Sequence, residues 1–284
     1  YNELCCTSFW LLLNQRFHRL RPEVESYVAE IESSIYNIGM ANQNHDKNIF
    51  YFAHLDGEKK NYKSLVHCCC GVGTKLFGAL PEYIWSVSPD ALYVDLFAAS
   101  EFTWERAGGA VQVRMETGMP YRHEVTLTFD CAPQDFALKI RIPRWADGDV
   151  TVMVNRQNAE VGQPGSYVSI ERTWQAGDRI DLNLPFAWKR TQYAGAEQVE
   201  GYERHAYEAG PLLMAFRGPL DEADHMALPC RPDDIPHLLT PTGKTLHYHL
   251  AGFAGVEIVP YLEIEPGESF TCFPLFIPTG TASD

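Results

Sequence analysis

The chain has 284 residues, enough for one large domain or two ordinary ones, with 45% hydrophobic and 21% charged residues, as in globular proteins. A formal net charge of −14 and a pI near 5.1 argue against nucleic acid or an anionic membrane as a partner. No apolar run approaches the roughly 20 residues of a membrane span, and the first residues lack the basic segment and cleavage site of a secretory signal.

The first 90 residues show the periodicity of helices. An amphipathic helix is predicted from the 3-4-3 spacing of four apolar residues, Trp10, Leu13, Phe17 and Leu20. A second helix is predicted from Pro22, which suits a first helical turn, to Gly39, a plausible stop. Residues 40–66 are expected to form a loop with a short extended piece at 49–52. A third helix is expected to follow the triple cysteine and to run to about Trp85.

From Asp90 onward the apolar period changes from 3.6 to 2, which is typical of strands with one buried face. Five runs carry this alternation: Leu92 to Leu96, Val125 to Phe129, Phe136 to Ile142, Val150 to Val154 and Ile180 to Leu184. Glycine-containing turns separate the runs, and short strands at this spacing predict an antiparallel β-sandwich. The tail after Gly218 is rich in proline, and its last apolar run, Phe270 to Ile277, is expected to be a closing strand.

Five of the eight cysteines lie in two short clusters, Cys5-Cys6 and Cys68-Cys69-Cys70, and Glu3 stands beside the first. Thiolates together with a carboxylate form a ligand set that zinc selects. Two alternatives are a dry core of buried cysteines and disulfides, although neighbouring cysteines rarely reach bridge geometry with one another. The other three cysteines, Cys131, Cys230 and Cys272, are expected to be buried among apolar residues.

A site with four protein ligands and no open position would by itself indicate structural zinc. Three cysteines and one glutamate form such a closed set, so the motif alone leaves a structural role open. Unpaired, clustered thiols favour a reducing compartment, and we therefore expect a cytoplasmic location.

The order of the motifs resembles a known family. The segments are Glu3-Leu4-Cys5, Glu32-Ser33-Ser34-Ile35-Tyr36-Asn37, Cys68-Cys69-Cys70-Gly71-Val72-Gly73, Arg141-Ile142-Pro143-Arg144-Trp145 and Arg172-Thr173-Trp174. Together they resemble the zinc-dependent cysteine glycosidases of the β-L-arabinofuranosidase family, over most of residues 1–217. The resemblance implies a catalytic (α/α)6 barrel followed by β-sandwich domains.

The resemblance also implies roles for individual residues. Glu3, Cys5, Cys68 and Cys69 match the zinc ligands, and Cys68 matches the nucleophile; a shift by one residue would make the pair Cys69 and Cys70 instead. Glu32 matches a carboxylate that contacts the sugar. The general acid/base glutamate of the family precedes the Glu-x-Cys motif, so no residue of this chain matches it.

One further residue is a candidate from its position alone. His67 stands directly before the triple cysteine, where it could orient a sugar hydroxyl or hydrogen-bond to a metal ligand, and we include it as a substrate-binding candidate.

These observations predict an α+β multidomain chain. Residues 1–90 would be the C-terminal helices of an (α/α)6 barrel with the metal site, 91–217 an antiparallel β-sandwich, and 218–284 a β-rich extension packing on it. The expected function is that of a retaining glycoside hydrolase acting on an arabinose-containing oligosaccharide or glycoconjugate, with zinc as cofactor and a thioglycosyl intermediate on Cys68. The alternative is a non-catalytic carbohydrate-binding protein with a structural zinc site.

Overall fold

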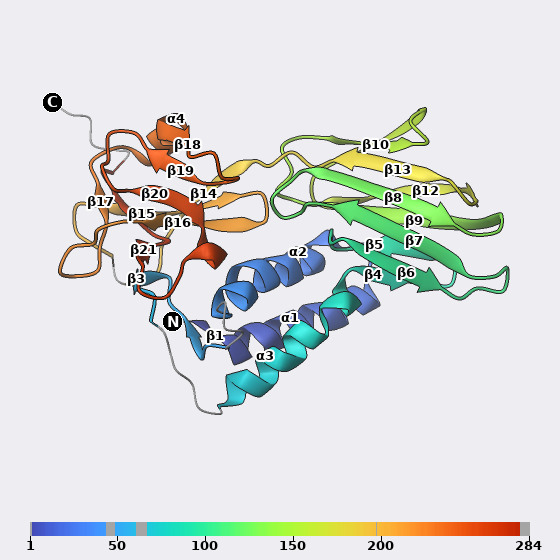
Figure 1. The fold of residues 1–284 in the computed structure, drawn as a ribbon, viewed down its shortest axis with the longest axis horizontal. Helices are drawn as coiled ribbons and strands as arrows, with labels where there is room; N and C mark the ends of the chain where they lie inside the picture. Colours follow the sequence, from blue (N-terminus) through green and yellow to red (C-terminus); the bar gives the residue numbers. More distant parts are fainter. Residues whose placement is uncertain (1, 44–48, 61–66, 197, 279–284) are drawn as a thin grey trace. The chain divides into compact units, whose positions relative to one another are not determined.

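The computed structural model describes residues 2–43, 49–60, 67–196 and 198–278. The chain is mixed α+β, with few helices and many strands (Figure 1). It divides into two compact units that combine segments distant in sequence. Unit one comprises Tyr1–Phe9, Ser33–Thr74 and Trp188–Asp284, and unit two comprises Trp10–Glu32 and Lys75–Ala187. The three domains expected from the sequence, 1–90, 91–217 and 218–284, stay a prediction.

The first two predicted helices are present with altered ends. Helix α1 spans Leu4–Leu20, and α2 spans Glu25–Ser33, three residues later than predicted. The chain then continues through a π-helical segment, Ser34–Gly39, and one 3-10 turn, Met40–Asn42. Gly39 does not end the helical path, because it keeps a right-handed backbone with φ −56°.

The third predicted helix is shorter than expected. Helix α3 spans Cys68–Gly78 and is followed by a 3-10 turn that contains Pro81. Trp85, the predicted helix end, instead begins strand β4 (Trp85–Val87). Proline lacks the N–H that a continuing helix would need, so the helix cannot extend through this position. A fourth, short helix, α4, spans Ile235–Leu238.

The predicted sandwich forms most of unit two (Figure 1). Its six-stranded sheet has the order β11-β10-β13-β8-β7-β6, and its four-stranded sheet has the order β12-β9-β5-β4. The bounds are β5 Ala91–Val94, β6 Ser100–Trp104, β7 Val111–Thr117, β8 Glu124–Asp130, β9 Gln134–Ile142, β10 Val150–Val154, β11 Asn158–Gly162, β12 Ser166–Trp174 and β13 Arg179–Asn183.

One pair of the sandwich departs from the antiparallel prediction. Strands β5 and β9 are parallel, with Leu92 opposite Leu138 and Val94 opposite Ile140. Parallel neighbours need a long crossover connection, and here the chain between them builds β6, β7 and β8 of the facing sheet. The prediction missed this pair because the alternation of apolar residues is the same for both strand directions.

The core of unit two lies between these two sheets. Alternate residues of each strand point inward, as in β7, where Val111, Val113 and Met115 are buried and the residues between them are exposed. Trp174 is fully buried and stacks on Phe129, with ring centroids 4.5 Å apart. The period of 2 in the sequence identified the buried apolar residues of β8, β9, β10 and β13, whereas β7 was not among the predicted runs and all four residues of β5 are buried.

Unit one contains a ten-stranded sheet built mainly from the C-terminal part of the chain. Its strands are β3 Asp56–Glu58, β14 Trp188–Gln192, β15 Glu203–Ala209, β16 Leu212–Arg217, β17 Ala227–Leu228, β18 Leu239–Pro241, β19 Tyr248–Leu250, β20 Glu257–Pro260, β21 Ser269–Thr271 and β22 Leu275–Phe276. The closing strand predicted at 270–277 is therefore present as two short strands. A separate pair, β1 (Asn2–Glu3) and β2 (Phe52–Ala53), joins the start of the chain to the predicted extended piece. The predicted loop at 40–66 lies partly outside the described residues.

Candidate metal and active site

Two chain segments of unit one bring the site residues together. Glu3 is the last residue of β1 and pairs with Phe52 of β2, and the backbone N–H of Leu4 donates to the carbonyl of Tyr51 over 3.2 Å. Cys5 follows in the first turn of α1, whereas Cys68 and Cys69 lie in the first turn of α3. All three thiols therefore stand at helix N-termini, where the helix dipole favours negative charge.

Gly73 explains how α3 can approach the start of α1 closely. A Cβ atom at this position would lie 2.8 Å from Leu4 Cδ2 and 2.9 Å from Ile49 Cγ2, so a side chain here would force these neighbours to shift. The glycine of the Cys-Cys-Cys-Gly-Val-Gly segment thus permits the approach that places Cys68 and Cys69 beside Glu3 and Cys5.

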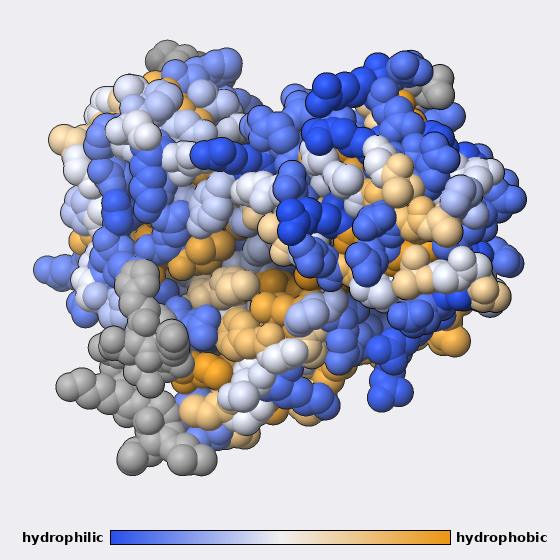
Figure 2. All heavy atoms as spheres, turned by 45° about the vertical axis from the view of Figure 1, so that its right-hand side comes forward, coloured by the Kyte–Doolittle hydropathy of each residue, from blue (hydrophilic) through white to orange (hydrophobic). Residues whose placement is uncertain are grey.

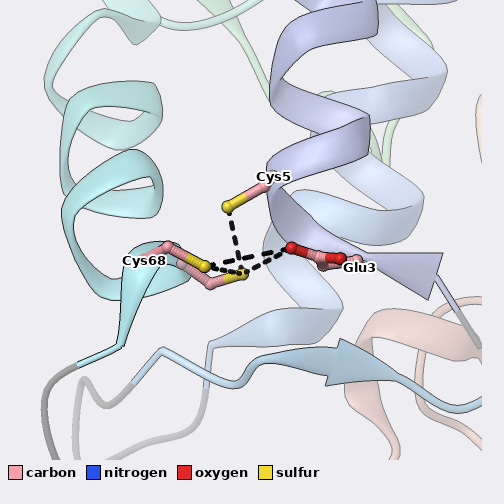
Figure 3. A group of neighbouring side chains, drawn as sticks. Glu3, Cys5 and Cys68 are labelled. Atoms are coloured by element: carbon pink, nitrogen blue, oxygen red, sulfur yellow. Dashed lines mark hydrogen bonds between the residues drawn. The ribbon is translucent and has the colours of Figure 1, made fainter.

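The side chains of Glu3, Cys5, Cys68 and Cys69 direct their potential metal-ligand atoms toward one another (Figure 3). The sulfur of Cys5 lies 3.3 Å from that of Cys69, which lies 3.9 Å from that of Cys68. Glu3 Oε1 lies 3.9 Å from each of the sulfurs of Cys68 and Cys69. All four ligand atoms lie within 4.8 Å of one another.

These distances fit a zinc ion held by four ligands. With Zn–S bonds of about 2.3 Å, two sulfurs of a tetrahedral site are separated by about 3.8 Å. The donor atoms of Glu3, Cys5, Cys68 and Cys69 are already spaced near this value, and three thiols with one carboxylate suit zinc chemically.

The thiols differ in burial and in acidity. Cys5 and Cys69 are buried, whereas Cys68 is exposed. Burial raises the pKa of the Cys5 thiol, and the neighbouring Cys69 and Cys68 thiols raise it further. Burial also raises the pKa of Cys69, whereas hydrogen bonds from Cys5 and Tyr51 lower the pKa of Cys68. Within the cluster, the accessible sulfur is thus also the most acidic of the three.

Sequence reasoning missed Tyr51. Its pKa is raised, first through the hydrogen bond to Cys68 and then through the negative charges of Cys68 and Glu3. The phenol therefore lies directly beside the exposed thiol. Tyr51 belongs to the predicted extended piece at 49–52, so pairing that piece with Glu3-Leu4 was the signal that could have revealed it.

His67 and Cys70 form a pair of their own next to the cluster. His67 Nε2 lies 3.5 Å from the sulfur of Cys70, and its Nδ1 accepts from the backbone N–H of Cys70 over 3.3 Å. Its ring also meets that of Tyr51 edge-on, with centroids 5.3 Å apart. Since Cys70 is not in the group of four, the geometry favours the Cys68–Cys69 pair over the register shifted by one residue.

Glu32, the remaining predicted site residue, belongs to unit two and is buried. Its Oε2 accepts from Arg141 Nη2 over 2.9 Å and from Trp145 Nε1 over 2.7 Å. The structure therefore brings together the four predicted metal ligands and places His67 beside them, while Glu32 has partners within its own unit.

The three cysteines outside the two clusters were expected to be buried among apolar residues. Cys131 and Cys272 are buried as expected, and Cys230 is half-buried. All eight cysteines lie in the described part of the chain, and none forms a disulfide. Among the described residues, no helix has the length and apolarity needed to cross a membrane.

Comparisons with known proteins match the sandwich most directly. Residues 91–186 match the family model for the middle domain of β-L-arabinofuranosidases of family GH127. No match was found among curated proteins.

Solved structures share the fold of nearly the whole chain. A glycoside hydrolase superimposes with a TM-score of 0.75 at 20% identity, covering 98% of this chain and 52% of its own. A GH127 β-arabinofuranosidase superimposes with a TM-score of 0.73 at 20% identity, covering 97% of this chain and 49% of its own. A GH127 β-L-arabinofuranosidase from Geobacillus stearothermophilus T6 superimposes with a TM-score of 0.70 at 20% identity, covering 97% of this chain and 50% of its own.

The chain spans about half the length of these structures. The predicted resemblance to the β-L-arabinofuranosidase family is confirmed as a resemblance: residues 91–186 match the GH127 middle-domain model, and the chain shares the fold of GH127 β-L-arabinofuranosidases over that half of their length.

Proposed function

We propose that the chain is part of a retaining, zinc-dependent β-L-arabinofuranosidase in which Cys68 is the nucleophile. The observation that carries the proposal is the group of Glu3, Cys5, Cys68 and Cys69, in which Cys68 is the exposed thiol. The match of the sandwich to a GH127 middle domain supports the same reaction class.

Zinc would be held by all four residues of this group. When bound, the ion keeps a coordinating thiol deprotonated at neutral pH, although an ordinary cysteine with a pKa near 8.5 would be mostly protonated. The buried Cys5 and Cys69 anchor the site, and Glu3 supplies the oxygen ligand. The position of Cys68 is fixed by its helix and by Tyr51, which matters for a pre-organised attack.

The reaction follows the double displacement of retaining glycosidases. The Cys68 sulfur attacks the anomeric carbon, so a C–S bond forms while the bond to the glycosidic oxygen breaks, and that oxygen takes a proton from a general acid. Water then attacks the same carbon, the C–S bond breaks, and the water proton returns to the acid group. Two inversions retain the configuration. Glu32 and His67 are proposed to contact the sugar.

The fold of the catalytic domain, the substrate and the cellular location are proposed on the same basis. Helices α1, α2 and α3 would belong to an (α/α)6 barrel, and the substrate would be an arabinose-containing oligosaccharide or glycoconjugate. Eight cysteines without a disulfide support a reducing, cytoplasmic location. The strongly acidic net charge of −14 supports neither nucleic acid nor an anionic membrane as partner.

The competing function is carbohydrate binding beside a structural zinc site. Four protein ligands around one metal is the arrangement of structural sites. The exposure of Cys68 favours the nucleophile, since a purely structural ligand gains nothing from contact with solvent.

Two measurements test the proposal. Protein purified without added metal is expected to contain about one zinc per chain, and Cys69→Ala should lose it. Cys6→Ala is the matched control, because Cys6 is an exposed cysteine next to a ligand but outside the group of four. Only trace zinc in the folded, unaltered protein would refute the metal site.

The second measurement identifies the nucleophile. A cysteine-directed electrophilic mimic of the arabinofuranoside should label Cys68 in the complete natural protein, as located by mass mapping. An adduct on Cys69 would move the nucleophile by one residue. Labelling confined to aspartate or glutamate would eliminate the thiolate mechanism.

A further inference from the structure

Two cavities on the sandwich are built without any residue of the thiol cluster, because every residue that lines them belongs to unit two. The first has a volume of about 460 Å³ and follows β6, β7 and β8. The second has a volume of about 730 Å³ and lies at the turn that joins β7 to β8. Both volumes fall within the range of ligand-binding sites, which is roughly 300–1,000 Å³.

The two cavities adjoin along β7. Glu116 lines both of them, and the lining residues on this strand and its turn run from Gln112 to Gly118. At about 3.4 Å per residue, that stretch is about 20 Å long. We call the two cavities together the β7 groove. A groove of this length suits a short chain of linked units better than one small molecule.

The polar side chains of the β7 groove reach solvent. Along β7, Gln112, Arg114 and Glu116 are exposed, whereas the residues between them are buried. The Arg114 side chain is held between two carboxylates: its Nε donates to Glu101 Oε1 over 2.9 Å, and its Nη1 lies 4.0 Å from Glu116 Oε1. The side chains of these three charged residues are 61–70% exposed, so their outer surfaces are open to a ligand.

The turn at the end of the β7 groove is fixed by hydrogen bonds. Thr117 Oγ1 donates to the carbonyl of Glu124 over 2.9 Å and accepts from the backbone N–H of Met119 over 3.1 Å. His123 Nδ1 lies 3.2 Å from the carbonyl of Leu184. Since a carbonyl can only accept, Nδ1 carries the proton, and Nε2 of the neutral ring is an acceptor.

Gly118 allows Arg122 to lie across this turn. A Cβ atom at Gly118 would lie 2.8 Å from Arg122 Cδ, so a side chain there would displace that of Arg122. The backbone N–H groups of Tyr121 and Arg122 both donate to the carbonyl of Gly118, over 3.0 and 3.1 Å. Tyr121 is half-buried and Arg122 is exposed, and both line the second cavity. The turn therefore presents an aromatic ring and a guanidinium group to the same cavity.

The chemistry of the lining excludes several classes of ligand. The charged lining residues are Glu101, Arg114, Glu116, Arg122, Glu124 and Asp130. Carboxylates outnumber arginines by four to two, so the charge of the groove disfavours an anion. None of the large apolar side chains exposed in the described part of the chain lines the groove, so a protein partner would find no apolar anchor. A neutral molecule with many hydroxyl groups fits this lining best.

We propose that the β7 groove is an accessory binding site for a neutral oligosaccharide. The ring of Tyr121 packs on the apolar face of a sugar, while Arg122, Glu116 and Glu124 form charge-assisted hydrogen bonds with its hydroxyl groups. The inference rests on the proposed function in one respect, the choice of an arabinose-containing oligosaccharide as the ligand. The groove holds a glycan on the protein without cleaving it and so raises the effective concentration of the glycan.

The test measures the binding of a short linear arabino-oligosaccharide to residues 1–284 by calorimetry. In the altered turn, Tyr121→Ala and Arg122→Ala are combined, which removes the ring and the guanidinium group. Arg156→Ala is the matched control, because Arg156 is a 77% exposed arginine in the turn between β10 and β11 of the same sheet and lines neither cavity. Cys69→Ala is measured as well, to separate the groove from the metal site. The Tm of each variant shows whether it is folded.

We expect the altered turn to weaken binding by roughly 10-fold or more, and Arg156→Ala and Cys69→Ala to leave it unchanged. In the unaltered chain, addition of the oligosaccharide should shift the NMR amide signals of residues 121–124. Absence of binding, equal binding by the altered turn, or shifts confined to residues outside the β7 groove would overturn the inference.

The same data separate this inference from the proposed function. If Cys69→Ala abolishes binding and the altered turn keeps it, the sugar binds at the metal site alone, so the proposed function gains support and the inference fails. If the altered turn loses binding in a protein whose unaltered form holds only trace zinc, the inference stands and the proposed zinc mechanism fails.

Discussion

Unit two contains the sandwich and residues 10–20 of helix α1. These two regions differ in whether their patterned apolar residues are buried or exposed. In the sandwich, alternate apolar residues are buried and the residues between them face solvent. In α1 the predicted apolar face is exposed: Trp10, Leu13, Phe17 and Leu20 are 42–78% accessible. The buried side of the helix instead carries polar residues, Asn14, Gln15 and His18, together with Leu11. Figure 2 shows hydrophobic residues at the surface over the helical region.

The contrast shows that the two regions differ in how many polar side chains they bury. Apolar burial stabilises the sandwich. The helices of unit two bury apolar residues such as Leu11 and Val28, and they add buried polar contacts. These contacts are His18 Nε2 to Asp95 Oδ2 at 3.1 Å and a buried cluster in which Arg141 binds Glu25 and Glu32. An apolar face of this size on a helix is characteristic of a surface that another element covers.

Removing the cation of the buried cluster should have the largest effect. Arg141→Met leaves Glu25 and Glu32 buried without a positive partner, and we expect a loss of about 3–5 kcal/mol in the free energy of unfolding. Arg144→Met is the matched control in the same segment. Its ion pair with Glu30 is 47% and 36% exposed, so the loss should be no more than about 1 kcal/mol. Urea unfolding of both variants measures the difference, and similar losses would show that polar contacts do not hold α2.

A smaller effect is expected from leucines on the two sides of α1. Leu11 is 1% exposed, and Leu11→Ala should cost about 2–5 kcal/mol. Leu13 is 42% exposed, so Leu13→Ala should change stability by about 0.5 kcal/mol or less and should reduce self-association. Unfolding curves and light scattering of residues 1–284 measure the two quantities. A reversed order would mean that the predicted apolar face is buried after all.

Much of the fold was predictable where a residue's neighbours in sequence decide its environment. The alternation in β8, β9 and β10 located their buried faces, because a strand places every second residue on one side. Helix ends were less predictable: Gly39 could have ended α2, and only the contacts of the following residues carry the chain onward to Asn42. The parallel pairing of β5 with β9 depends on the path of the chain through the other sheet, which periodicity does not encode.

The site was predictable to the extent that its residues form motifs. Glu3, Cys5, Cys68 and Cys69 stand at spacings that indicate ligands, and the structure brings them together. Tyr51 was missed because no motif marks it; it reaches Cys68 through the pairing of β1 with β2. The partners of Glu32 were missed for a similar reason, since Arg141 and Trp145 lie more than 100 positions away in the sequence.

The smallest effect concerns charge within the sandwich, where apolar burial should dominate. Arg179 donates to Asp181 over 2.6 Å from Nη2, and hydrogen bonds from Arg179 and Thr126 lower the pKa of Asp181 below its usual 3.8. A carboxyl group whose pKa is lower in the folded state stabilises the fold above its unfolded pKa and loses that contribution as pH falls through the folded value. Asp181→Asn should therefore destabilise the sandwich at pH 7, by no more than about 1 kcal/mol for a pair this exposed, and the difference should vanish well below pH 3.8. High salt should reduce it at pH 7, because the pair is accessible to screening ions. Urea midpoints at several pH values measure the trend, and a difference that persists in acid would assign the effect of Asp181 to packing rather than charge.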